Sequence, residues 1–300
     1  MATMYFAKVN VNQNIYDVYK DFNKLKEIYN EMLEKEWQQE RVTDVSHNKI
    51  TKEPETETYK FICIDKMYDR FYIVGKLIMI FQDDIALYDR KKDDIDSIAQ
   101  SELSRAVPFY FDLTSEIVAF VPTQKFSRQK FIKYFEQLLN KIYGKPMFNL
   151  YIKNNASDLR RQIKLINKVS EVEITLIPPN SSKADFAALF PKTGEELEET
   201  NGTKFIQKIS APHSDKGLNM DASLFQRIIN GVARGFGIIQ AQGIDGNGHK
   251  KSVSSDKSAP HKKDIKNSCR NSLGEVADYG RAGISEIQAA ETQRRIDDML

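Results

Sequence analysis

Residues 59–81 read YKFICIDKMYDRFYIVGKLIMIF. Aromatic and β-branched residues fill both ends of this stretch, whereas the centre, Met67 to Arg70, has the composition of a turn. The pattern predicts a β-hairpin with strands over Tyr59 to Ile64 and Phe71 to Phe81. A chain of 300 residues that contains such hairpins and is 41% apolar can bury a sizeable core, and its length favours two domains.

Strands and loops are predicted on both sides of this hairpin. By the same criteria, strands fall at residues 5–11, 109–113, 117–121, 147–152, 172–176, 205–209, 236–242 and 250–253. The strand at 172–176 alternates apolar and polar residues, which is typical of an edge or outer strand. The strands at 109–113 and 117–121 are predicted to form a second hairpin. Between the two hairpins, residues 93–103 are predicted to form a short helix, and residues 192–202 are predicted to form an acidic loop.

Amphipathic helices accompany the strands. Apolar residues three and four apart predict a long helix that begins after a cap at Asn14 and runs through Met32. Because Glu36 breaks the apolar repeat that a coiled coil needs, we expect this helix to pack on the protein's own sheet. Further helices are predicted at 127–142, around 159–166, after a cap at Asp221, and from Ser285 to Met299. The fold class is therefore α+β, with mixed or antiparallel sheets built from hairpins, in two parts at 1–122 and 123–300.

Charge is distributed unevenly along the chain. The net charge is +2, but residues 1–104 hold 15 basic and 20 acidic residues, a net of −5, so the remainder carries +7. A basic second half is expected of a protein that faces an anionic partner.

The strongest local signal is a cluster of six glycines that leads into a basic segment. Between Gly231 and Arg270 the cations outnumber the acids by five, and the Asp-Gly and Asn-Gly dipeptides of residues 245–248 predict a hairpin turn. Glycines permit close backbone approach and clustered lysines attract phosphate oxygens, so this segment indicates contact with a polyanion.

Two predicted helices, at 127–142 and around 159–166, each have one face that is rich in lysine or arginine. Together with the basic segment they predict a nucleic-acid-binding surface, with duplex DNA favoured and no cofactor or metal. The candidate residues are Lys130, Lys133, Arg160, Arg161, Lys164, Lys250, Lys251, Lys262 and Lys263.

Other chemistries find little support in the sequence. Residues 243–252 resemble a phosphate-binding loop, but His249 occupies the position that the lysine must hold. The four histidines are scattered, and Cys63 and Cys269 define neither a metal site nor a disulfide framework. No apolar segment is long enough to span a bilayer, so a cytoplasmic protein is expected.

Two alternatives stay open. A metal-dependent nuclease would use paired carboxylates, for which Glu171 and Glu173 on one face of a predicted strand are the best candidates. A protein-interaction subunit, or a homo-oligomer, would bury the Asn14–Trp37 and Ser285–Met299 helices against a partner chain.

Three apolar stretches are informative as a set: ELSRAVPFYF at 102–111, IVAF at 117–120 and VEITLIP at 172–178. In these stretches and in the order of its elements, the chain resembles the Rex-type anti-phage proteins of bacteria and prophages. It implies non-specific binding to duplex DNA and a role in abortive infection, and it assigns no individual residue.

Overall fold

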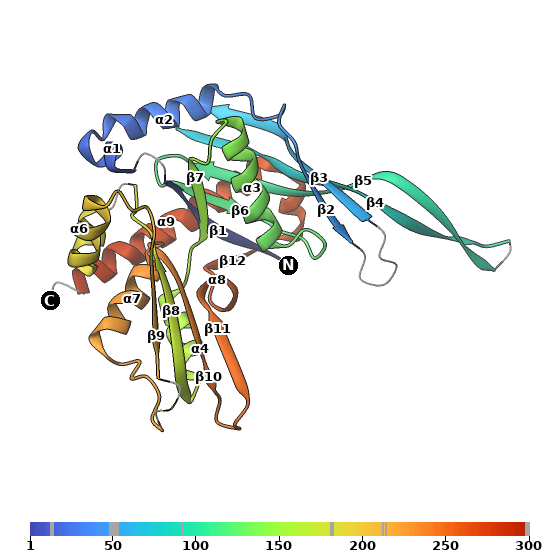
Figure 1. The fold of residues 1–300 in the computed structure, drawn as a ribbon. Helices are drawn as coiled ribbons and strands as arrows, with labels where there is room; N and C mark the ends of the chain where they lie inside the picture. Colours follow the sequence, from blue (N-terminus) through green and yellow to red (C-terminus); the bar gives the residue numbers. More distant parts are fainter. Residues whose placement is uncertain are drawn as a thin grey trace.

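The computed structural model describes residues 1–12, 15–47, 54–91, 93–180, 183–211, 213 and 215–297. Within these ranges, helices flank two separate antiparallel sheets, one above the other in Figure 1. The predicted α+β class in two parts is confirmed. The division into domains at residue 122 stays a prediction. Strands β7 and β12, which come after residue 122, pair with β1, which comes before it.

The larger sheet has the strand order β12-β1-β6-β5-β4-β3-β2, and β7 also pairs with β1. Its strands are β1 (Ala2–Val11), β2 (Val42–His47), β3 (Pro54–Met67), β4 (Tyr72–Asp89), β5 (Asp94–Asp112), β6 (Ile117–Phe120), β7 (Phe148–Ile152) and β12 (Lys262–Ile265). Both predicted hairpins are confirmed as β3–β4 and β5–β6. The helix predicted at 93–103 is wrong, because the ladder with β4 draws these residues into β5.

Helices cover both faces of the larger sheet. On one face, α2 (Asn23–Glu34) and α3 (Arg128–Ile142) enclose an aromatic core in which Phe135 contacts the rings of Trp37 and Phe109. On the other, α9 (Leu273–Asp297) brings Gly283 so close to Phe6 that a Cβ would overlap the ring. Packing of the N-terminal helix on the protein's own sheet is thus confirmed.

The smaller sheet has the order β11-β10-β8-β9. Its strands are β11 (Lys250–Ser254), β10 (Gly237–Ile244), β8 (Lys168–Leu176) and β9 (Phe205–Ser210). One face packs against α4 (Ala156–Lys164), α5 (Lys183–Leu189), α6 (Pro191–Glu199) and α7 (Ser223–Ala233). The edge position predicted for residues 172–176 is wrong, because β8 lies between β10 and β9. The helices of this core pack on one face of the sheet, so buried apolar residues alternate with polar residues along β8.

Several predicted helix boundaries are also wrong. The single N-terminal helix is two, α1 (Ile15–Lys20) and α2, separated at Asp21 and Phe22, while Asn14 lies outside the described residues. The loop predicted at 192–202 is helix α6, which has Pro191 in its first turn and buries Leu197. The cap of α7 is Ala222 rather than Asp221.

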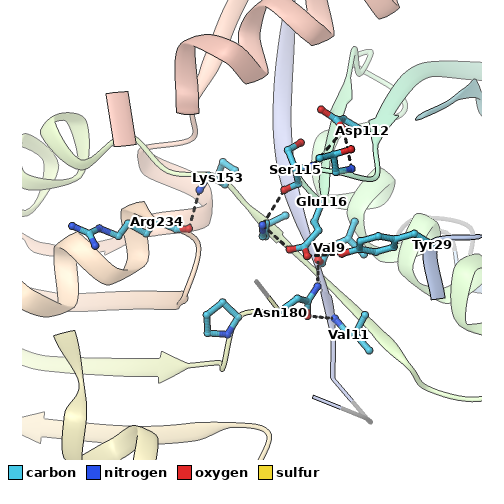
Figure 2. A network of polar contacts seen from close by, with 12 residues as sticks. Val9, Val11, Tyr29, Asp112, Ser115, Glu116, Lys153, Asn180 and Arg234 are labelled. Atoms are coloured by element: carbon cyan, nitrogen blue, oxygen red, sulfur yellow. Dashed lines mark hydrogen bonds and ion pairs between the residues drawn. The ribbon is translucent and has the colours of Figure 1, made fainter. Parts of the chain in front are cut away.

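A loop of the smaller part completes the hydrogen bonding of β1. Strand β7 pairs with one side of β1 through Val11, but on the other side β6 pairs with β1 only as far as Lys8. On that side, no strand of the described sheet reaches the Val9 carbonyl and the Val11 N–H. The side-chain amide of Asn180 takes the place of such a strand: Nδ2 donates to the Val9 carbonyl at 3.1 Å, and the Val11 N–H donates to Oδ1 at 2.7 Å (Figure 2). This buried residue thereby fastens the smaller part to the larger sheet.

Replacing Asn180 by alanine is expected to lower the free energy of unfolding by about 2 kcal/mol, because a buried N–H and a buried carbonyl lose their partners. Chemical denaturation monitored by circular dichroism measures this change. Gln207→Ala, at an exposed position of β9, is the control and is expected to stay within about 0.5 kcal/mol. Equal stabilities of the two variants would show that the amide does not fasten the two parts.

Candidate nucleic-acid interface

One continuous segment, residues 250–265, forms an edge of each sheet. It begins with β11 at the edge of the smaller sheet, passes through the short helix α8 (Ser255–Ser258) and ends in β12 at the edge of the larger sheet. Figure 1 shows these elements in succession below and beside the start of β1. Its lysines therefore lie along both parts of the molecule.

The hairpin turn that precedes this segment has the predicted chemistry. The Asp245 carboxylate accepts hydrogen bonds from the backbone N–H groups of Asn247 and His249, at 2.9 and 3.0 Å, and Gly248 has a φ of +81°. The register then pairs Lys250 with Ile244 and Lys251 with Gly243. Because successive strand residues face opposite sides, the two lysines flank the edge of the smaller sheet from both faces.

Arg128, at the start of α3, lies beside the middle and the last strand of this segment. Its Nη2 donates to the carbonyl of Lys257 at 2.6 Å, and its guanidinium lies 5.2 Å from the ring centroid of Tyr5. Tyr5 is in turn the β1 partner of Lys262. The contacts thus place Arg128 between α8 and β12, and we call Arg128, Lys250, Lys251, Lys257 and Lys262 the basic edge.

Within the described ranges, none of the four lysines of the basic edge forms an ion pair. Lys250, Lys257 and Lys262 are exposed and Lys251 is half-buried. The two acids of the same segment are engaged by hydroxyl groups: Asp256 accepts from Ser254, and Asp264 accepts from Thr3 at 3.1 Å. These hydrogen bonds leave both carboxylates charged, but neither forms an ion pair with a lysine of the basic edge. In the part of the chain that the structure describes, the four lysines therefore lie along an accessible strand edge without ion-pair partners.

The predicted cations of α3 both form ion pairs. Lys130 forms an ion pair with Glu57 at 2.6 Å, and Lys133 forms one with Asp44 at 2.9 Å. Hydrogen bonds from Tyr134 and Lys133 hold the pKa of Asp44 below its ordinary value. These two lysines are therefore engaged with the strands that α3 covers.

The remaining predicted cations are divided between internal and exposed positions. Arg160 donates to the side chains of Gln226 and Asn230 on α7, so it ties α4 to α7. Arg161 forms an exposed ion pair with Asp158 at 2.8 Å, and Lys263 forms one with Glu286 of α9 at 2.5 Å. Lys164 is exposed at the end of α4.

The carboxylate pair of the nuclease alternative lies in β8. Glu171 forms an ion pair with Lys208 of β9 at 2.8 Å, and this hydrogen bond raises the pKa of Lys208. Glu173 pairs in register with the same lysine. In the part of the chain that the structure describes, no three His, Cys, Asp or Glu side chains are grouped to hold a metal ion, and no helix is long and apolar enough to cross a membrane.

The helices of the protein-interaction alternative both pack internally. Leu25, Ile28 and Met32 of α2 belong to the core of the larger sheet. Val276, Ile284 and Ile287 of α9 pack on the opposite face of that sheet. Much of the apolar surface that this alternative would offer to a partner chain is thus buried within the protein itself, although Phe22 is exposed.

The sequence model of one protein family matches residues 2–275, a range that includes both sheets and the whole basic edge. The chain belongs to this family. It is described as "Domain of unknown function (DUF4747)". No curated protein matches the sequence.

Two residues of the basic edge were missed by the sequence analysis. Lys257 precedes Ala259 and Pro260 in a stretch without clear periodicity, so no element was assigned to it. Arg128 stands in the first turn of a correctly predicted helix, but its proximity to Lys257 arises only from the folding of the chain. The excess of lysines between residues 250 and 263 indicates Lys257 as a contact residue, whereas Arg128 lies outside that stretch.

Proposed function

We propose that this DUF4747 protein binds nucleic acid through backbone phosphates, with duplex DNA the favoured ligand and the basic edge the contact surface. The observation that carries the proposal is a run of four lysines along one edge of each sheet, with Arg128 between α8 and β12. Among the described residues, no carboxylate forms an ion pair with these lysines. Lysine is a compact charge that binds phosphate, and contacts to phosphate carry no information on base sequence. Such a surface suits binding that is independent of sequence.

The resemblance to Rex-type proteins supports a cellular role for this binding. We place the protein in the bacterial cytoplasm as a DNA-binding component of an anti-phage, abortive-infection response, acting as a homo-oligomer or with a partner protein. Both cysteines are free thiols, as is usual in a reducing compartment.

Lys257→Gln tests the proposal at a single residue. Removing one phosphate contact is expected to reduce the slope of log K against log salt concentration by about 0.9. Filter binding of a labelled duplex over a range of salt concentrations gives this slope. Lys130→Gln removes the same charge from a lysine that is paired with Glu57 and is expected to leave the slope unchanged. Equal slopes for both variants would remove the basic edge from the contact surface.

A further inference from the structure

A pocket of about 210 Å³ lies between α2 and two turns of the larger sheet. One face of α2 contributes residues three and four apart, and the β3–β4 and β5–β6 turns contribute the rest. The lining residues are Phe22, Leu25, Lys26, Tyr29, Phe71, Thr114 and Glu116. None of them belongs to the basic edge, so this pocket is separate from the proposed nucleic-acid interface.

The floor of the pocket holds a buried carboxylate. Glu116 is only 1% exposed, accepts a hydrogen bond from the Tyr29 hydroxyl and lies 2.7 Å from the Lys8 ammonium (Figure 2). Burial, together with the neighbouring Glu116, raises the pKa of Tyr29 well above its ordinary value, so the hydroxyl stays protonated and donates. A carboxylate has about four acceptor positions, so Glu116 retains the capacity to accept from a ligand.

The charge of Glu116 is already balanced by Lys8. A cationic ligand would add a further positive charge beside Lys8 and Lys26, and an anion at the floor would be repelled by the carboxylate. The floor therefore favours an uncharged ligand that offers a hydrogen-bond donor.

Backbone strain occurs at two of the lining residues. Phe71 and Glu116 have φ angles of +50° and +60°, a region that residues other than glycine rarely occupy. The strand ends hold both residues in place, because the Leu113 N–H donates to the Phe71 carbonyl and the Val9 N–H donates to the Glu116 carbonyl. Such strain is unfavourable and clusters at binding sites.

Two aromatic rings stand at the mouth of the pocket. Phe22 is 54% exposed and Phe71 is 36% exposed, although both are large and apolar. An aromatic ligand would cover these faces, and stacking against aromatic side chains is favourable in protein sites. The volume limits the ligand to one small ring system, since a cavity of about 150 Å³ accommodates benzene.

We propose that this pocket binds a small, uncharged, planar aromatic compound that carries an N–H donor, which stacks on Phe22 and Phe71 and donates to Glu116. The proposal is independent of nucleic-acid binding, because it rests on other residues and is tested without nucleic acid.

Indole and benzofuran are matched probes, since they share size and shape but only indole has an N–H donor. Ligand-observed NMR titration of the full-length protein is expected to show indole binding at least about tenfold more tightly, as the loss of a hydrogen bond to a charged acceptor predicts. Equal binding of the two probes, or no binding of either, would overturn the proposal.

Two variants locate the site. Phe22→Ala is expected to weaken indole binding by about tenfold, whereas Ile206→Ala, at an equally exposed apolar position of β9, leaves it unchanged. Phe71→Gly removes both the ring and the backbone strain, so the variant should fold normally and still bind indole weakly. Wild-type indole affinity in Phe22→Ala and Phe71→Gly would place the ligand elsewhere and refute the assignment.

Discussion

Raising the salt concentration from about 50 to about 200 mM is expected to weaken nucleic-acid binding by about five-hundredfold. The five cations of the basic edge, if each contacts one phosphate of a duplex, give a log–log slope of about −4.5 through counterion release. Filter binding or fluorescence anisotropy with a labelled duplex of random sequence measures the slope. A flat response to salt would refute binding through phosphates.

A pair of matched variants separates the basic edge from the net charge of the protein. Changing Lys250, Lys251, Lys257 and Lys262 to glutamine leaves only Arg128 and is expected to reduce the slope to about −0.9. The control changes four lysines that form ion pairs elsewhere, namely Lys24, Lys35, Lys183 and Lys192. Both variants lose four charges, but only the first should lose salt-dependent binding.

Much of the fold followed from local sequence because the hairpins are short-range structures. The predicted strands of β3, β4, β5 and β6 are connected by turns of a few residues, so alternation and turn composition were enough to predict the pairing. Helix α3 was similarly local, since the Ser127 side chain caps it by accepting from the backbone N–H of Lys130.

Two predictions were wrong for different reasons: pairing with another strand decided the structure of residues 94–103, and a different cap residue decided where the last helix begins. Residues 94–103 follow β4 into a strand only because a long partner is present. The last helix begins at Leu273, where the Ser272 hydroxyl accepts from the N–H of Glu275. Ser272 therefore caps the helix, whereas Ser285, the predicted cap, lies inside the helix and donates to the Arg281 carbonyl.

The candidate site was only partly accessible to sequence reasoning, because charge counts do not reveal which lysines have partners. Lys130 and Lys250 look alike in sequence, yet Glu57 lies beside the first and no carboxylate of the described residues pairs with the second. Glu57 is 73 residues distant from Lys130 along the chain. Only the folded arrangement of β3 beneath α3 brings them together.

Lys8→Met is expected to lower the free energy of unfolding by about 3–5 kcal/mol, the largest effect on stability that we predict. The side chain of Lys8 is 12% exposed and that of Glu116 is 1% exposed, so methionine would leave a buried carboxylate without its cation. The Lys8 ammonium also donates to the Ser115 carbonyl at 2.9 Å, which would lose this partner as well. Chemical denaturation measures the change.

A second substitution distinguishes the loss of compensation from the loss of packing. In Lys8→Met with Glu116→Gln, the buried charge is absent and the glutamine oxygen still accepts from Tyr29, so most of the lost stability should return. Lys24→Met is the control, because its pairing with Asp17 spans 4.0 Å at the surface and is expected to be worth less than about 1 kcal/mol. If Lys8→Met were as mild as Lys24→Met, Glu116 would not depend on Lys8, and the reasoning that the pocket floor favours an uncharged ligand would fail with it.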